Sequence, residues 1–222
     1  MRHVRLDDKL TAMPTSPTAA VSRGPRQDNR RFQLLDAAAR LFNERGYHAT
    51  SMRDIAKEVG MLSGSIYYHF QSKEEMLLAV YEQGMQRIAE GVDQAVSAAD
   101  QSWLRLEAAC AAHLRGLLVY HDYAIVMIRT LPSEAGAAGP RIRELRRSYE
   151  ARFRGLIDDL SLPAHIDRRY VLLMLFGALN WSHVWYRPGG EPPETVAHHF
   201  IDTLKYQLEL PASDSLPASA TT

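Results

Sequence analysis

Apolar side chains between residues 30 and 210 recur with the roughly 3.6-residue period of an amphipathic helix. One such stripe consists of Ile142, Leu145, Tyr149, Phe153, Leu156 and Leu160. The strict alternation of a half-buried strand is almost absent, as are runs rich in Val, Ile and Thr. The pattern predicts an all-α fold with about nine helices.

Start and stop signals divide the chain into these helices. Gly46 and Gly60 are typical of helix ends, and Thr50 or Ser51 can cap the helix between them. Ser72 followed by Glu75 is a capping box that starts a long helix. The remaining helices are expected at about 103–120, 123–131, 142–160, 170–185 and 195–210.

Charge and composition limit the classes of function. The 26 basic and 26 acidic residues cancel, so any contact with nucleic acid must come from a local patch. Residues 1–31 supply one, with seven Lys or Arg against three Asp. The single cysteine, Cys110, excludes an intramolecular disulfide framework. Without a signal peptide or a membrane-length apolar run, the chain is expected to be cytoplasmic, with no membrane partner.

These features suggest four regions. Residues 1–27 are expected to form a flexible basic arm, and residues 211–222 a disordered tail. Between them, residues 28–75 hold the short front helices and residues 76–210 hold the longer ones.

The segment GSIYYHF (64–70) follows a short helix and a four-residue turn that contains Gly60. This arrangement is the signature of a helix-turn-helix, whose second helix enters the major groove of DNA. The small residues Ser63, Gly64 and Ser65 permit close approach to phosphate. The partner predicted from this motif is a double-stranded DNA operator.

The run TSMRDIAKEVGMLSGSIYYHFQSKEEML resembles the DNA-binding segment of TetR-family transcriptional regulators, and the resemblance covers about residues 30–80. It implies that Arg53 reads a base and that Ser63, Gly64, Ser65 and Tyr68 face the groove. It also implies phosphate contacts from Thr50, Tyr67, His69 and Lys73. Ile66 and Phe70 are expected to pack this helix onto the domain. The alternative for both tyrosines is a place in the core.

The helix expected at 170–185 is apolar on nearly every side. Such a helix must be covered on every side, which is difficult within one chain of this size. The last two helices are therefore predicted to form a homodimer interface, as a four-helix bundle across a two-fold axis.

The resemblance implies a DNA-binding domain at residues 28–75 and a ligand-binding and dimerisation domain at residues 76–210, which senses a small hydrophobic effector. Large apolar groups and a few polar ones are the composition of such a pocket. The candidate ligand-binding residues are Trp103, His113, Tyr120, Tyr123, Met127, Arg129, Met174, Asn180 and Trp181. Aromatic residues at helical spacing are also typical of an ordinary core.

NWSHVWYRPGG (180–190) and MLSGSIYYHF are similar to a TetR subgroup that controls fatty-acid or steroid catabolism and senses acyl-CoA thioesters. Six arginines between Arg141 and Arg154 could bind CoA phosphates, or could form a solvated face. The resemblance implies a repressor that binds a palindromic operator as a homodimer and is released by its effector. Open alternatives are an unrelated drug-like or aromatic effector, and no ligand.

A helical metal-dependent enzyme is the main rival from another class. His198 and His199, with His113 and His121, are its candidate ligands, but no HExxH occurs. Nor is there a GxSxG or GxGxxG motif. We therefore expect no catalytic residues, no metal and no cofactor.

Overall fold

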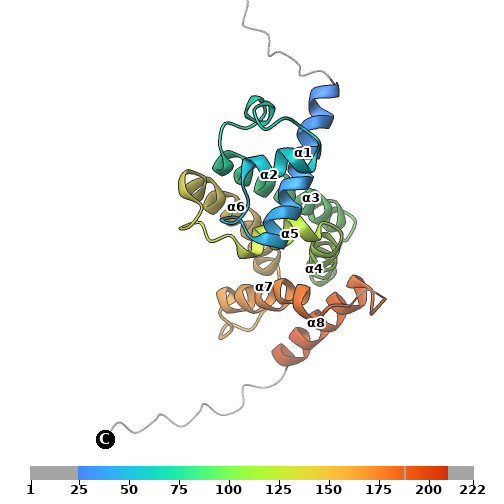
Figure 1. Cartoon of the computed structure of the whole chain (residues 1–222). Coiled ribbons are helices and arrows are strands. Elements are labelled where there is room, and N and C mark those ends of the chain that lie inside the picture. Colours follow the sequence, from blue (N-terminus) through green and yellow to red (C-terminus); the bar gives the residue numbers. More distant parts are fainter. Residues whose placement is uncertain (1–24, 188, 210–222) are drawn as a thin grey trace, which may run out of the picture.

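A computed structural model describes residues 25–187 and 189–209. Within these residues the chain is entirely helical, with eight α-helices and two 3-10 helices, as the periodicity predicts (Figure 1). The tail and residues 1–24 of the predicted arm lie outside the described residues, whereas residues 25–27 already belong to the first helix. No described helix is both long and apolar enough to cross a membrane.

The elements follow one another in a single series along the chain. Their bounds are α1 Pro25–Arg45, α2 Met52–Glu58, η1 Ser65–Tyr68, α3 Lys73–Ser97, α4 Ser102–Val119, α5 His121–Arg129, η2 Gly136–Ala138, α6 Gly139–Asp158, α7 Arg168–Trp185 and α8 Pro193–Glu209. The segment expected as the second helix of the helix-turn-helix is the 3-10 helix η1.

Local hydrogen bonds explain where the front helices begin. Ser51 caps α2 in a reciprocal capping box with Asp54. The Ser72 hydroxyl accepts from the backbone N–H of Glu75 at the start of α3. The Glu75 carboxylate accepts from the backbone N–H of Gln71 at 2.6 Å, one residue before the position that a capping box predicts.

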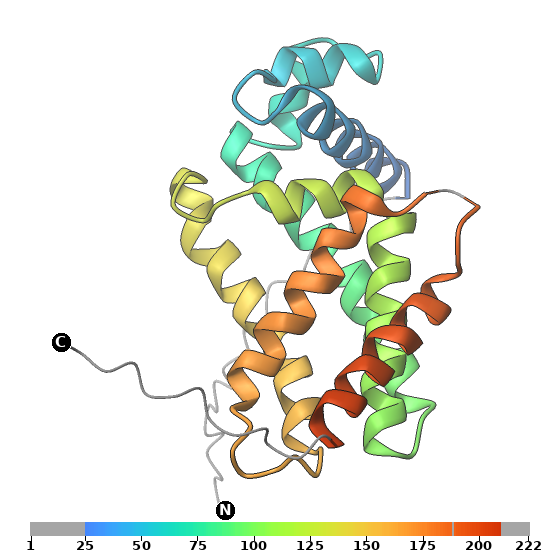
Figure 2. The same ribbon diagram turned by 90° about the horizontal axis from the view of Figure 1, so that it is seen from below.

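The helices form two groups joined by α3. Figures 1 and 2 show α1, α2 and η1 at one end of the molecule and α7 and α8 away from them. Helix α3 begins beside η1 and packs on α4, α5 and α6. Helix α7 packs on α4 and α6, and α8 packs on α4. A continuous apolar core runs through both groups.

Helix α7 is apolar on both faces but is covered on only one. Val171, Leu172, Leu175 and Leu179 are buried against the domain. The opposite face exposes Tyr170, Leu173, Met174, Trp181, Val184 and Trp185. Within the described part of the chain, this apolar face of α7 is thus left without cover.

Candidate DNA-binding surface and effector cavity

The short helix η1 is held by two side chains. Ile66 and Phe70 are fully buried, as predicted, and join the core that contains Leu41, Phe42 and Ile55. Burying these two side chains fixes the orientation of a helix that is too short to be stable alone. The remaining faces of η1 are therefore presented to solvent in one orientation.

The solvent-facing side of η1 carries the residues predicted to face DNA. Tyr67 is 47% exposed and Tyr68 is 73% exposed, so the alternative of two core aromatics is wrong. Ser63, Gly64 and Ser65 are exposed, and His69 is half-buried with its ring edge-on to Tyr68. The surface thus combines small residues with two phenols.

Arg53 projects from α2 beside this surface. It is exposed and forms no hydrogen bond or ion pair with any residue in the described part of the chain. A surface groove brings Arg53 together with Tyr67, Thr50 and Lys73. A guanidinium with unused donors suits the acceptor pair of guanine.

Thr50 and Lys73, both expected to contact phosphate, form hydrogen bonds within the protein. Thr50 is 1% exposed, and its hydroxyl lies 2.9 Å from the carbonyl oxygen of Gly46 and 3.2 Å from that of Leu41. Lys73 Nζ donates to the carbonyl oxygens of Tyr47 and Thr50 at 2.9 and 3.0 Å. Its third contact is the carbonyl oxygen of His48 at 3.4 Å. Both residues hold the loop between α1 and α2 in place.

Replacing Lys73 with methionine is therefore expected to lower stability, by about 1–3 kcal/mol, because three carbonyl oxygens lose a charged donor. Thermal unfolding measures the loss. Lys57→Met, at an exposed position on α2, is the control and should leave the melting temperature nearly unchanged. Equal melting temperatures for the two variants would contradict this role of Lys73.

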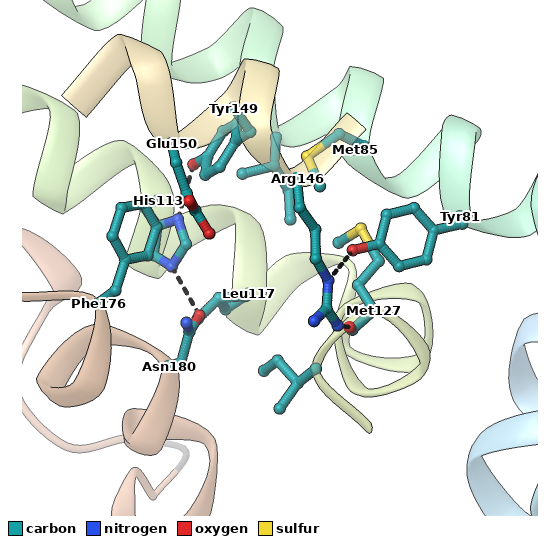
Figure 3. A pocket seen from close by; sticks show the side chains of 12 residues that line it. Tyr81, Met85, His113, Leu117, Met127, Arg146, Tyr149, Glu150, Phe176 and Asn180 are labelled. Atoms are coloured by element: carbon teal, nitrogen blue, oxygen red, sulfur yellow. Dashed lines mark hydrogen bonds between the residues drawn. The ribbon is translucent and has the colours of Figure 1, made fainter. Parts of the chain in front are cut away.

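A cavity of about 180 Å³ lies among α3, α4, α5, α6 and α7 (Figure 3). Its wall is mostly apolar with a few polar groups, as in small-molecule sites. The lining residues are Tyr81, Met85, Ile88, His113, Leu117, Met127, Ile128, Arg146, Tyr149, Glu150, Phe176 and Asn180. The cavity therefore adjoins α3, the helix that begins beside η1.

His113 forms the centre of a polar chain in the cavity wall. Its Nδ1 lies 2.7 Å from the Tyr149 hydroxyl and its Nε2 lies 3.3 Å from Asn180 Oδ1 (Figure 3). Because an amide oxygen only accepts, Nε2 carries the proton and Nδ1 accepts from the hydroxyl. Burial lowers the pKa of His113 to about 4, opposed by the hydrogen bond to Asn180. The ring is therefore neutral near pH 7.

This depressed pKa predicts a pH dependence of stability. Between the ordinary value of 6.5 and about 4, the unfolded chain binds a proton at His113 and the folded chain does not. The free energy of unfolding should fall as the pH falls through this window, by up to about 3 kcal/mol. Denaturant titrations at several pH values measure the slope. His113→Gln should lose this component, and an unchanged slope would contradict the buried neutral state.

Arg146 supplies the cation in the cavity wall. Its Nε donates to the Tyr81 hydroxyl at 2.7 Å, and its Nη2 donates to the carbonyl oxygens of Met127 and Thr130, both at 2.7 Å. Among the described residues, no carboxylate pairs with it. Arg146 thereby ties α6 to α3 and to the end of α5.

The structure brings together three of the nine predicted ligand-binding residues: His113, Met127 and Asn180. The others lie elsewhere. On α7 the reason is helix phase: Trp181 follows Asn180 by about 100° and is 62% exposed, and Met174 is 56% exposed. The Tyr123 hydroxyl donates to Asp36 on α1 at 2.6 Å, and Arg129 lies in a groove beside α1. Trp103 and Tyr120 are half-buried outside the cavity, where Lys205 and Arg87 lie over their rings.

Sequence reasoning named none of the three α3 residues that line the cavity, which are Tyr81, Met85 and Ile88. These residues belong to an ordinary apolar stripe, and no local signal distinguishes them from core. The proposed metal ligands are not brought together: His198 lies beside Glu107 and Asp202, at 3.2 and 3.1 Å. No group of three potential metal ligands occurs within the described residues.

The helix-turn-helix surface is exposed, and its domain is joined to the cavity by α3 and by the packing of α1 on α5. A helix-turn-helix beside a partly apolar cavity is typical of a DNA-binding regulator with an effector site. The family described as "Bacterial regulatory proteins, tetR family" matches residues 34–80. The domain described as "Tetracyclin repressor-like, C-terminal domain" matches residues 99–208. The chain belongs to the TetR family of DNA-binding transcriptional regulators.

The relatives include a repressor and an activator of transcription. The chain is 30% identical over 215 residues to the HTH-type transcriptional repressor KstR2 of Rhodococcus jostii, covering 91% of this chain and 99% of the relative. It is 30% identical to the HTH-type transcriptional activator FasR of Mycolicibacterium smegmatis, covering 76% of this chain and 78% of the relative.

Solved structures share the architecture. The ketosteroid transcriptional regulator KstR2 of Mycobacterium tuberculosis superimposes with a TM-score of 0.69 at 25% identity, covering 81% of this chain and 94% of the other. AibR, in complex with isovaleryl coenzyme A and operator DNA, also gives a TM-score of 0.69, at 26% identity, covering 78% of this chain and 97% of the other.

Proposed function

We propose that this regulator binds a pseudo-palindromic operator as a homodimer and is released by an apolar effector bound in the cavity, so that it acts as a repressor. One observation carries the proposal. Helix α3 begins at Lys73, five residues after η1 ends at Tyr68, and also supplies Tyr81, Met85 and Ile88 to the cavity wall. An effector that displaces α3 changes the position of η1.

The exposed face of α7 supports the homodimer. Tyr170, Leu173, Gly177, Trp181 and Val184 follow one another at intervals of three or four residues and are all exposed. This spacing is that of a helix-packing seam, and an apolar seam without cover is typical of an interface. A second copy related by a two-fold axis buries it and places two η1 helices on one duplex.

The names of the relatives favour a lipid-like effector. AibR was solved with isovaleryl coenzyme A, KstR2 is described as a ketosteroid regulator, and a further relative from Bacillus subtilis is a fatty acid metabolism regulator protein. An acyl-CoA thioester is accordingly the proposed effector of this chain. The apolar wall formed by Ile88, Leu117 and Phe176 suits an acyl body, and the polar chain at Asn180 can donate to a carbonyl.

Selection of bound duplexes from a random DNA pool tests the binding half of the proposal. The expected product is an inverted repeat whose half-sites lie about one helical turn apart, or a multiple of it. A selected motif without two-fold symmetry would contradict the homodimer. A pool that shows no enrichment would contradict site-specific binding.

A further inference from the structure

A surface groove between α3 and α6 meets the cavity at Met85. The groove has a volume of about 390 Å³ and is lined by Glu82, Met85, Gln86, Ala89, Arg141, Leu145, Ser148 and Arg152. Met85 also lines the cavity, and Figure 3 shows it beside Arg146 and Tyr149. The groove and the cavity thus adjoin at the Met85 side chain.

An arginine stands at each end of this groove. Arg141 Nε lies 3.2 Å from Glu82 Oε1, and Arg152 Nε lies 2.9 Å from Asp93 Oδ1. From the first ion pair to the second, the residue number rises by eleven on α3 and also by eleven on α6. The two helices therefore run side by side in the same direction. Eleven helical residues span about 16 Å, which sets the distance between the two cations along the groove.

These ion pairs can be exchanged for a ligand. Their side chains are 35–56% exposed, and exposed ion pairs contribute little to stability. Arg141 Nη1 also donates to Glu144 at 2.8 Å, in a pair that is likewise exposed. A guanidinium binds phosphate with two parallel hydrogen bonds, as it binds a carboxylate. Both arginines can therefore exchange their carboxylate partners Glu82, Glu144 and Asp93 for a multiply charged phosphate group.

Met85 suits the position between the two spaces. Its unbranched side chain has three rotatable bonds, so it can change rotamer without moving α3.

Inside the cavity Arg146 and Glu150 balance in charge, and His113 is buried. The cavity therefore favours an uncharged apolar body, while the lining of the groove, with Arg141 and Arg152 against Glu82, carries a net positive charge.

We propose that the α3–α6 groove is the entrance to the effector cavity and the binding site for a phosphate-bearing head group, held by Arg141 and Arg152. The ligand class is an amphiphile whose apolar body passes Met85 and whose phosphates remain in the groove. This inference rests on the proposed function of the cavity. It adds the path of entry and the residues that bind the charge.

Calorimetric titration without DNA tests the proposal. The probes are octanoyl-CoA, CoA alone and the N-acetylcysteamine thioester of octanoic acid, which has the same acyl group and no phosphate. For the double variant Arg141→Gln/Arg152→Gln, we expect a roughly 10- to 100-fold weaker affinity for octanoyl-CoA, because two charge-assisted contacts are lost. Its affinity for the N-acetylcysteamine thioester should match that of the wild type.

Arg147→Gln/Arg154→Gln is the matched control, since both arginines are exposed on α6 and neither lines the groove. It should bind octanoyl-CoA as the wild type does. An equal loss in the two double variants, or a loss that extends to the N-acetylcysteamine thioester, would overturn the head-group site. If octanoyl-CoA releases the operator but the Arg141/Arg152 variant binds it normally, the groove is wrong and the proposed function stands. If neither thioester binds the wild type, both are wrong.

Discussion

Arg53→Ala and Tyr68→Ala are each expected to lower the affinity for the selected operator by about 10- to 100-fold, the magnitude of one lost base-reading contact. Arg53 is exposed with no partner among the described residues, and Tyr68 is 73% exposed, so neither side chain contributes to the core. Binding to random duplexes should change less for Tyr68→Ala, because a base contact specifies sequence and phosphate contacts do not. Fluorescence anisotropy with specific and random duplexes measures both.

The melting temperatures of these variants show whether weaker binding comes from a lost DNA contact or from a destabilised fold. Lys57→Ala, exposed on the same helix as Arg53, is the control and should retain the preference for the operator. If Arg53→Ala or Tyr68→Ala unfolds, or binds the operator as tightly as the control does, the assignment of these side chains to DNA is wrong.

Trp181→Glu is expected to convert the proposed homodimer to a monomer and to weaken operator binding by at least about 100-fold. Trp181 is 62% exposed on the apolar face of α7, and a two-fold interface through this face buries the residue once from each copy. Two carboxylates in a desolvated interface cost several kcal/mol. A monomer contacts only one half-site, so it loses the affinity that comes from binding two half-sites with two linked domains.

Light scattering coupled to gel filtration measures the mass of the variant. Val119→Glu is the control, since Val119 is 65% exposed at the end of α4, away from α7 in sequence. The control should remain a dimer with normal operator affinity. A dimeric Trp181→Glu protein would show that another surface holds the two copies together.

Local signals explain why the helices could be predicted. Capping residues such as Ser51 and Ser72 and the glycines after α1 and α2 act within one helical turn, so they can be read from sequence. The orientation of η1 was predictable for the same reason. Ile66 and Phe70 are four residues apart and share one face, which leaves the tyrosines outside.

Long-range packing explains what could not be predicted. Whether an apolar residue on α7 faces the cavity or the solvent depends on which face meets α4 and α6, and the sequence carries apolar residues on both faces. The phosphate contacts of Thr50 and Lys73 were implied by the family resemblance. Their hydrogen bonds to loop carbonyl oxygens were not predicted, because only the folded loop between α1 and α2 brings these groups within reach.

The most direct measurement is the affinity for operator DNA in the presence of acyl-CoA thioesters. Fluorescence anisotropy monitors binding while thioesters of increasing chain length, and thioesters of steroid-derived acids, are titrated in. An effector shifts the equilibrium only by the difference between its affinities for the two states. We predict that at least one thioester weakens operator binding by about 5- to 150-fold, the usual range of coupling between two sites. Operator affinity that stays constant with every thioester, although the protein binds one of them, would contradict control of η1 from the cavity.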